Sequence, residues 1–235
     1  MPRARQTLTE INRVVTHLVE ASLANDQNFS FLRELGANRT EVTFNGAEYL
    51  TLGLKDLDYT EVYDALRAER AYTVLLPDGA MLQFNYQFLD DELEKHRLAF
   101  WPSPHLEQFQ NDPDIYLEDS VFAEIVSRRV VPFPIRFDHN LNDPLIEQVR
   151  HPVSHLTLGQ YENCRIPLSA PLPPAHFIDF ILRNFYSSAF SDYAADLPRF
   201  SNSFDDCISE NELALIHLQI PRTIYRPRNT NPSSV

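Results

Sequence analysis

The chain has 235 residues, and 43% of them are hydrophobic, so it is long and apolar enough to bury the core of a folded domain. Its formal net charge of −13 disfavours a sequence-independent binder of duplex nucleic acid, because that function needs a basic face. Two cysteines and five glycines are too few for a secreted disulfide scaffold or for a glycine-rich phosphate loop.

A helix is the first predicted element of the chain. Apolar residues recur there at helical spacing, at Leu8, Ile11, Val14, Val15, Leu18 and Val19. Thr7 and Glu10 have the spacing of a capping box, so the helix is predicted over residues 9–24. A short strand is predicted at 41–44, and a second helix is predicted to follow Asp58.

An antiparallel meander is predicted next. Pro77, Asp78 and Gly79 mark a turn that leads into a strand over residues 81–89. Apolar and polar residues alternate along that strand, which predicts that only one of its faces is buried. An acidic cluster at 90–94 predicts a second turn, and a strand is predicted at 96–101.

Prolines interrupt the second half of the chain. A helix is predicted at 119–128 and a strand at 130–138, in which Pro132 and Pro134 indicate an edge strand or a bulge. Pro174 begins a strongly apolar helix, and alternation at 213–220 predicts a last strand. From Pro221 onward the composition predicts a basic tail that packs little on the domain.

Together these elements predict an α+β fold in which an antiparallel β-sheet or meander packs against helices. Residues 1–220 are expected to form a single domain, and residues 221–235 a flexible basic tail. No apolar run approaches the roughly 20 residues of a membrane span, and the amino terminus lacks the apolar region of a signal peptide. We therefore expect a cytoplasmic protein that does not engage a membrane.

Polar residues that could carry chemistry gather between Arg136 and Arg165. Arg136 and Asp138 would point to one face of a strand, where they could form an ion pair or act together on a substrate. Histidine titrates near neutral pH, which suits a general acid or base. The candidate catalytic residues are therefore His151, His155, Asp138 and Arg136, and the candidate substrate-binding residues are Arg165 and Ser154.

The linker of residues 140–150 is polar and long enough to bring the strand at 130–138 beside the segment at 154–158. If the two segments pair, Arg136, Asp138 and His155 would share one face, with His151 at its rim. The alternative is a satisfied loop in which His155 is a buried structural histidine and the Arg–Asp pair only stabilises the fold.

Other uses of the same residues stay open. On a helix, His151 and His155 would lie on one face, as metal-binding pairs often do. On a strand they would lie roughly 13 Å apart, unless a turn at Pro152 brought them together. Cys164 could act with His155 as a nucleophile pair or be a small buried hydrophobe. Further metal ligands would have to come from Asp138, His139 and Cys164. Because this set has no recognised ligand spacing, neither a metal nor a cofactor is expected.

Several runs of the sequence resemble a bacterial family catalogued as domain-of-unknown-function family 2290. They are His-Pro-Val-Ser-His-Leu-Thr-Leu-Gly at 151–159, Cys-Arg-Ile-Pro at 164–167 and the apolar helix that follows. The resemblance covers most of the chain, including Asp78, Gly79 and the aromatic strand after them. It implies a bacterial origin, no assigned activity, and a place in mobile or defence gene neighbourhoods.

A second similarity concerns the order of the motifs. An Asp-Gly hairpin, an aromatic strand, Arg-Phe-Asp at 136–138, a histidine-rich segment and a closing helix follow one another. This order is similar to that of small bacterial toxins of one toxin–antitoxin class, which carry Arg-Tyr-Asp and Pro-His-His-Lys-His signatures, and it implies a ribonuclease. Arg136, Asp138, His151 and His155 match in type, whereas the dense histidine cluster and its lysine are missing here.

Two hypotheses of function follow. The first is a ribonuclease-like effector of a toxin–antitoxin or phage-defence system, which cleaves RNA without a metal. In it Arg136 would hold a phosphate, a histidine would move the proton, and Asp138 would orient one of them. The second is a non-catalytic adaptor that binds a protein partner, either an antitoxin or a defence-complex subunit, through its acidic surface and basic tail. The oligomeric state is not predicted.

Overall fold

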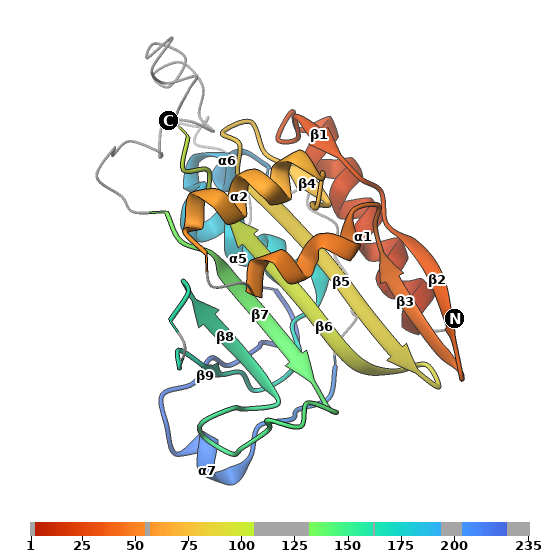
Figure 1. Cartoon of the computed structure of the whole chain (residues 1–235), viewed down its shortest axis with the longest axis vertical. Coiled ribbons are helices and arrows are strands. Elements are labelled where there is room, and N and C mark those ends of the chain that lie inside the picture. The colour runs from red at the N-terminus through yellow and green to blue at the C-terminus, as the bar shows by residue number, and fades with distance from the viewer. Residues whose placement is uncertain (1–2, 55–56, 106–131, 162, 194–203, 225–235) are drawn as a thin grey trace, which may run out of the picture.

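A computed structural model describes residues 3–54, 57–105, 132–161, 163–193 and 204–224 of the chain (Figure 1). Within these ranges the strands form one nine-stranded sheet, and helices lie on both of its faces. The named strands pair antiparallel throughout. The predicted α+β class, with an antiparallel sheet packed against helices, is confirmed.

The sheet has the order β1-β4-β5-β6-β7-β8-β9, while β3 pairs with the far half of β5 and with β2. The strands are β1 (Asp26–Gln27), β2 (Phe31–Gly36), β3 (Arg39–Thr43), β4 (Val74–Leu75), β5 (Met81–Leu89), β6 (Glu92–Trp101), β7 (Ile135–Asn140), β8 (Ser154–Leu158) and β9 (Ile166–Pro167). The helices are α1 (Arg3–Glu20), the 3-10 helix η1 (Ala47–Leu54), α2 (Tyr59–Ala68), α5 (Pro174–Phe185), α6 (Ser187–Tyr193) and α7 (Glu210–Leu213).

The predicted meander is confirmed as β4, β5 and β6. Gly79 has a φ of +86°, and a Cβ at this position would lie 3.1 Å from Ser103, so the first turn requires glycine. In the second turn Asp90 and Asp91 have φ values of 50° and 66°. Positive φ at both central residues suits the twist of a tight hairpin, and aspartate tolerates this conformation.

Strand β5 is buried on both faces, so the prediction of one buried face is wrong. Leu82 and Phe84 face the main core, while Gln83 faces a smaller cluster that α2 covers. The amide of Gln83 donates to the Ala71 carbonyl oxygen at 2.6 Å and accepts from Trp101 Nε1 at 2.9 Å. These hydrogen bonds let a polar residue occupy a buried position, which the alternating pattern could not indicate.

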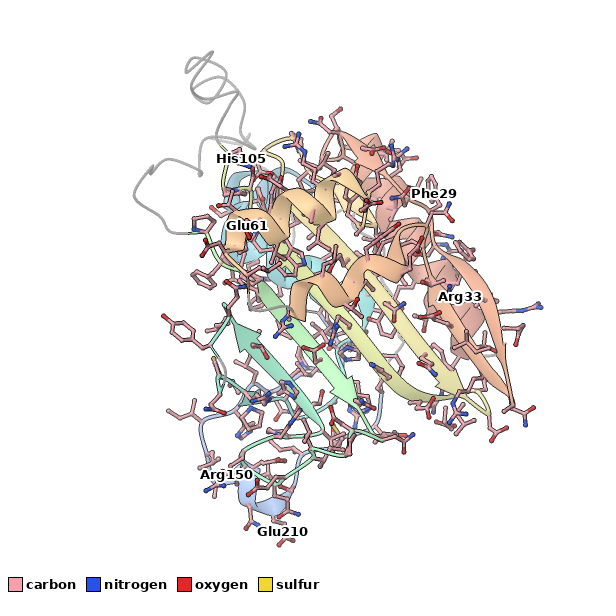
Figure 2. The ribbon with its side chains drawn as sticks, viewed as in Figure 1. Phe29, Arg33, Glu61, His105, Arg150 and Glu210 are labelled. Carbon is pink, nitrogen blue, oxygen red and sulfur yellow. The ribbon has the colours of Figure 1, made fainter. Side chains whose placement is uncertain are left out.

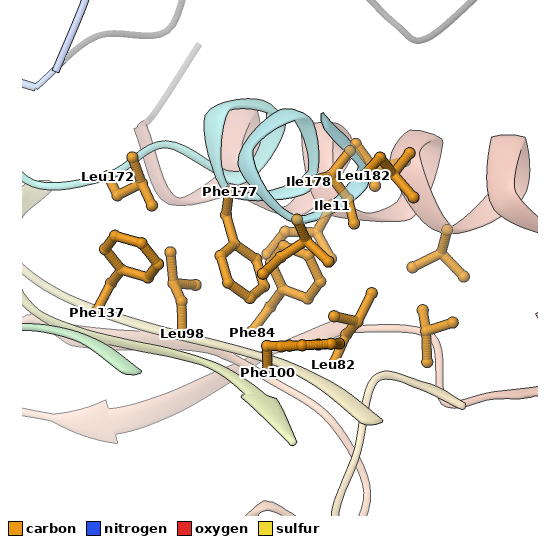
Figure 3. Packing of buried hydrophobic residues seen from close by; sticks show 14 of the residues in the cluster. Ile11, Leu82, Phe84, Leu98, Phe100, Phe137, Leu172, Phe177, Ile178 and Leu182 are labelled. Atoms are coloured by element: carbon orange, nitrogen blue, oxygen red, sulfur yellow. The ribbon is translucent and has the colours of Figure 1, made fainter. Parts of the chain in front are cut away.

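The main core lies between the sheet and the two helices α1 and α5 (Figure 3). Phe177 of α5 meets Phe84 edge to face, with ring centroids 5.2 Å apart, and it meets Phe137 of β7 at 5.9 Å. Ile11 of α1 packs beside them (Figure 3). The predicted apolar helix from Pro174 is confirmed, with proline at its first position.

Helix α1 begins at Arg3, so the predicted start at the Thr7–Glu10 capping box is wrong. Both residues lie inside the helix and are buried. Glu10 reaches across to α5, where its Oε1 accepts the Ala175 backbone N–H at 2.9 Å. The carboxylate thus satisfies a free N–H in the first turn of a different helix.

Two further strand predictions are corrected. Strand β7 pairs with β6 and β8, so it is interior, and Pro132 and Pro134 precede it instead of interrupting its ladder. The segment at 213–220 is not a strand. It holds the end of α7, which Ser209 and Glu212 cap, and a single bridge from Leu218. The helix predicted at 119–128 lies outside the described residues.

The start of the predicted tail contacts the domain. His176 Nε2 donates to the Pro221 carbonyl oxygen at 2.8 Å, and Arg222 donates to the Phe204 carbonyl oxygen at 3.0 Å. Residues 225–235 lie outside the described ranges, so the flexible tail and the domain limits stay predictions. No helix in the described part of the chain is long and apolar enough to cross a membrane.

We expect Glu10→Ala to lower the free energy of unfolding by about 2 kcal/mol, because it leaves the buried Ala175 N–H without its acceptor. Urea denaturation followed by circular dichroism measures this change. Glu20→Ala, at the exposed end of the same helix, is the matched control and should change stability by less than about 0.5 kcal/mol. Equal effects of the two substitutions would contradict the role assigned to Glu10.

Candidate functional site

A pocket of about 660 Å³ opens on the sheet face opposite the main core. Its floor is formed by the parts of β6, β7 and β8 on which α2 does not pack. Gly53 of η1 borders one side of the pocket, and the turn at 159–161 borders it beside β8. The linker between β7 and β8 contributes residues Asp143, Ile146, His151, Pro152 and Val153 to the opposite end.

The strand register brings the floor residues together. Asp138 of β7 lies opposite Arg97 of β6 and opposite His155 of β8. Directly opposite residues point to the same face with Cβ atoms roughly 4.5–5.5 Å apart. Arg136, two residues before Asp138, therefore shares that face. The structure thus places Arg136, Asp138 and His155 together on the floor of the pocket.

Asp138 forms an ion pair with Arg97, whose Nε donates to Asp138 Oδ1 at 2.8 Å. The sequence suggested Arg136 as the partner, but the opposite residue on a neighbouring strand is closer than one two places along the same strand. Burial raises the pKa of Asp138, yet the attraction of Arg97 and Arg136 more than offsets it and lowers the pKa to about 2.

Arg136 is left without a carboxylate directly opposite it, because Ala99 and Thr157 occupy those positions. Its Nε is buried and has no hydrogen-bond acceptor among the described residues. Burial lowers the pKa of Arg136, and repulsion from Arg97 and Arg165 adds to the effect, although Asp138 opposes it. An anion in the pocket would complete the hydrogen bonding of this guanidinium.

His151 and His155 meet edge to face, with ring centroids 5.1 Å apart. His151 precedes β8, and the chain bends at Val153 between the two histidines, which lets their rings meet. His155 Nδ1 donates to the Pro152 carbonyl oxygen at 2.8 Å, so the unprotonated nitrogen of the neutral ring is Nε2. Burial lowers the pKa of His155, which keeps the ring neutral at pH 7.

His151 is held by the linker that precedes it. Its backbone N–H and carbonyl exchange hydrogen bonds with Glu147, at 2.7 and 3.2 Å. Its Nε2 lies 3.8 Å from Asp143 Oδ2. Val149 at the tip of this turn has a φ of 75° and donates its N–H to Glu212 of α7 at 3.3 Å. The backbone at Val149 is therefore strained next to the candidate site.

The pocket is locally basic although the chain is acidic. Lys95, Arg97, Arg136 and Arg165 line it, against the carboxylates of Asp138 and Asp143. Four cations face two anions, whereas the whole chain carries a net charge of −13. The pocket therefore attracts anions at short range, where screening by salt and solvent is weakest.

Not all the predicted residues reach the pocket. Arg165 lines it, but Ser154 lies on the opposite face of β8, is only 2% exposed, and is paired in register with His139. His139 borders the pocket, but its ring stacks on the buried His96, and burial lowers the pKa of His139 to about 4. Cys164 is half-buried outside the pocket lining.

Asp138 and His139 are consecutive on β7 and so point to opposite faces of the sheet, and Cys164 does not line the pocket. Within the described ranges, no three His, Cys, Asp or Glu side chains are grouped to hold a metal ion. The pairing of Cys164 with His155 as a nucleophile and base is not present in this arrangement either, since Cys164 does not line the pocket.

Sequence reasoning missed Lys95, Arg97, Gln160 and Tyr161. The first two stand on the polar side of β6, alternating with the buried His96 and Leu98. A strand predicted to begin at residue 96 cut this alternation short. Two charged residues on one face of a strand within a meander were the signal that could have indicated the site.

A family model described as "Uncharacterized conserved protein (DUF2290)" matches residues 23–220 of the chain. This match confirms the resemblance that the runs at 151–159 and 164–167 suggested. No curated protein and no solved structure matches the chain. The similarity to histidine-rich toxins therefore stays a hypothesis.

Asp138→Asn should lower the free energy of unfolding by roughly 2–3 kcal/mol at pH 7, because it leaves Arg97 and Arg136 uncompensated. A carboxylate with a depressed folded-state pKa stabilises the fold above its unfolded value of about 4, and this contribution is lost as the pH falls through about 2. The difference between wild type and variant should therefore shrink between pH 5 and pH 2.

Urea denaturation across that pH range measures this difference. Asp205→Asn, at an exposed position outside the pocket, is the control and should show little change at any pH. A difference for Asp138→Asn that does not depend on pH would contradict the ion-pair assignment.

Proposed function

This chain belongs to the DUF2290 family, and we propose that it is a ribonuclease-like effector whose pocket binds and cleaves an RNA phosphodiester. The observation that carries the proposal is the partly buried guanidinium of Arg136, whose buried Nε lacks an acceptor among the described residues. Such a group costs stability unless a ligand supplies the missing acceptor. Its position beside His155 joins an anion-binding group to a proton-accepting one.

A phosphate is the anion that this pocket suits best. Arginine presents a planar fork of donors that matches two phosphate oxygens, and Arg136 and Arg165 both face the pocket. A volume of about 660 Å³ falls within the range of pockets that hold small organic ligands, which is enough for a nucleotide. The local excess of positive charge allows an acidic protein to bind it.

The two histidines suit the acid and base of phosphodiester cleavage. His155 Nε2 would take the proton from the ribose 2′-OH as its oxygen bonds to phosphorus. His151, next to Asp143, would give a proton to the 5′-oxygen as the bond from phosphorus to that oxygen breaks. The products are a 2′,3′-cyclic phosphate and a free 5′-hydroxyl, and Arg136 would stabilise the charge that develops on the phosphoryl oxygens.

The choice of RNA rests on chemistry and on similarity together. The 2′-OH supplies the internal nucleophile that an acid–base pair needs. The order of the Arg-Phe-Asp strand end and the histidine segment is similar to that of the toxins noted above, and this similarity also supports a role in a toxin–antitoxin or phage-defence system in the cytoplasm.

A second candidate function is that of a partner-binding subunit in a defence complex, and an apolar surface favours it. Large apolar side chains are exposed on the β7–β8 linker and around α7, with Ile216 93% and Leu145 69% exposed. Hydrogen bonds from Val149 to Glu212 and from Asn211 to Gln148 join the two segments at one end of the molecule, where Figure 2 labels Arg150 and Glu210. Loss of biological function in Ile216→Asp but not in a His155 variant would favour this role.

We expect Arg136→Met to weaken binding of inorganic phosphate by about 10- to 100-fold, because a charged pair of donors is lost. The same substitution should change the melting temperature little, because the desolvation cost of this partly buried charge offsets its attraction to Asp138. Isothermal titration and thermal denaturation give the two quantities. Arg33→Gln is the control, because Arg33 lies on β2 at the right-hand margin of the molecule in Figure 2 and does not line the pocket.

His155→Asn should reduce RNA cleavage by about 100- to 10,000-fold while the fold is kept. The asparagine Nδ2 can still donate to the Pro152 carbonyl oxygen, but no nitrogen is left at the position of Nε2. The wild-type rate should fall in acid only below pH 6.5, because the pKa of His155 is lowered and the base must be neutral.

His217→Asn is the matched control, because its Nδ1 likewise donates to a backbone carbonyl, that of Leu215, outside the pocket. Gel assays of a labelled RNA, together with melting temperatures, separate loss of activity from loss of stability. Cleavage by the His155→Asn protein at the wild-type rate would refute the assignment of the base.

A further inference from the structure

Resting on the proposed function, we infer that Tyr161 is a stacking platform for an unpaired base, so that the pocket takes single-stranded RNA. Tyr161 lines the pocket and is 77% exposed. Aromatic side chains at such exposure are costly to leave in water, and a base stacked on one gains free energy whatever its identity. The residue lies in the turn that links β8 to Arg165, beside the proposed phosphate site.

The platform is held in place before any ligand binds. The Gly159 N–H donates to the Pro134 carbonyl oxygen at 2.7 Å, and Gln160 Nε2 donates to the Leu57 carbonyl oxygen at 2.8 Å. These bonds tie the turn to the start of β7 on one side and to the segment before α2 on the other. The backbone that carries Tyr161 is therefore held on two sides, so little of its conformational freedom is lost when a base stacks on the ring.

Gly159 allows the ring to lie close to the backbone. Its φ is +66°, and a Cβ there would meet the Tyr161 ring at 3.4 and 3.5 Å and Phe133 at 3.7 Å. A side chain at this position would be strained and would crowd the ring. The Cβ of Phe133, a residue that is 44% exposed, lies next to the same position.

The depth of the site favours an unpaired strand over a duplex. His155 is 7% exposed and lies on the floor, among strands, while Tyr161 stands at the rim. A duplex keeps its bases stacked inside and presents a wide rod of phosphates, which the net charge of −13 repels at a distance. A single strand can place one phosphate on the floor and turn the adjacent base onto the rim.

The test measures binding of a fluorescein-labelled single-stranded RNA of about ten nucleotides, compared with a duplex of the same sequence, an abasic ribose-phosphate oligomer and inorganic phosphate. Tyr161→Ala should weaken binding of the single strand about 10-fold and leave binding of the abasic oligomer and of phosphate unchanged. Tyr161→Phe keeps the ring and should bind as the wild type does. Phe29→Ala removes an exposed aromatic residue at the other margin of the molecule (Figure 2) and should have no effect.

The pattern of losses separates the two proposals. If Arg136→Met loses all anion binding while Tyr161→Ala binds RNA as tightly as the wild type, the phosphate site stands and the stacking platform is refuted. If Tyr161→Ala weakens binding of the abasic oligomer as much as binding of the RNA, the effect of the substitution is structural and the platform is likewise refuted. Equal or tighter binding of the duplex overturns the single-strand assignment. If the wild type binds none of the four probes, both proposals fail.

Discussion

The register of β6, β7 and β8 is the constraint on which the site depends. Ile135 and Phe137 are buried against α5, and this packing decides which face of β7 points into the core. A slip of one residue would exchange the two faces and bury Arg136 and Asp138 in an apolar layer. The free energy of burying the aromatic side chains therefore holds the polar residues in the pocket.

Within that register, the charges are arranged unequally. Asp138 lies between strands that supply Arg97 on one side and His155 on the other, so its charge is satisfied and held. Arg136 has only Ala99 and Thr157 opposite it. The Asp138–Arg97 ion pair is thus complete, while Arg136 stays available for a ligand. The fold tolerates the desolvation cost of Arg136 because the surrounding core is large.

The elements around the floor position the other residues of the candidate site. The linker between β7 and β8 is anchored where Asn142 Nδ2 donates to Glu94 at 2.6 Å and where Val149 donates to Glu212, and within it Glu147 bonds to the backbone of His151. This anchoring sets His151 against His155. On the other side the turn of Gly159 and Gln160 fixes the rim. Two histidines, several cations and an exposed ring thereby meet on elements of one sheet and its anchored loops, which is what a preorganised site requires.

Periodicity in the sequence determined the elements and the side of each that is apolar. The alternation at 81–89 and in 135–137 identified strands, and the spacing after Pro174 identified α5, because local side-chain patterns follow the geometry of the backbone. Composition also excluded a disulfide scaffold, and local motifs indicated the family. Tertiary structure alone decided that Asp138 pairs with Arg97, that Ser154 faces the core, and that Lys95 and Tyr161 join the site. These outcomes depend on which strands become neighbours and in what register. Contacts between residues that are distant in the chain produce no periodic pattern in the sequence.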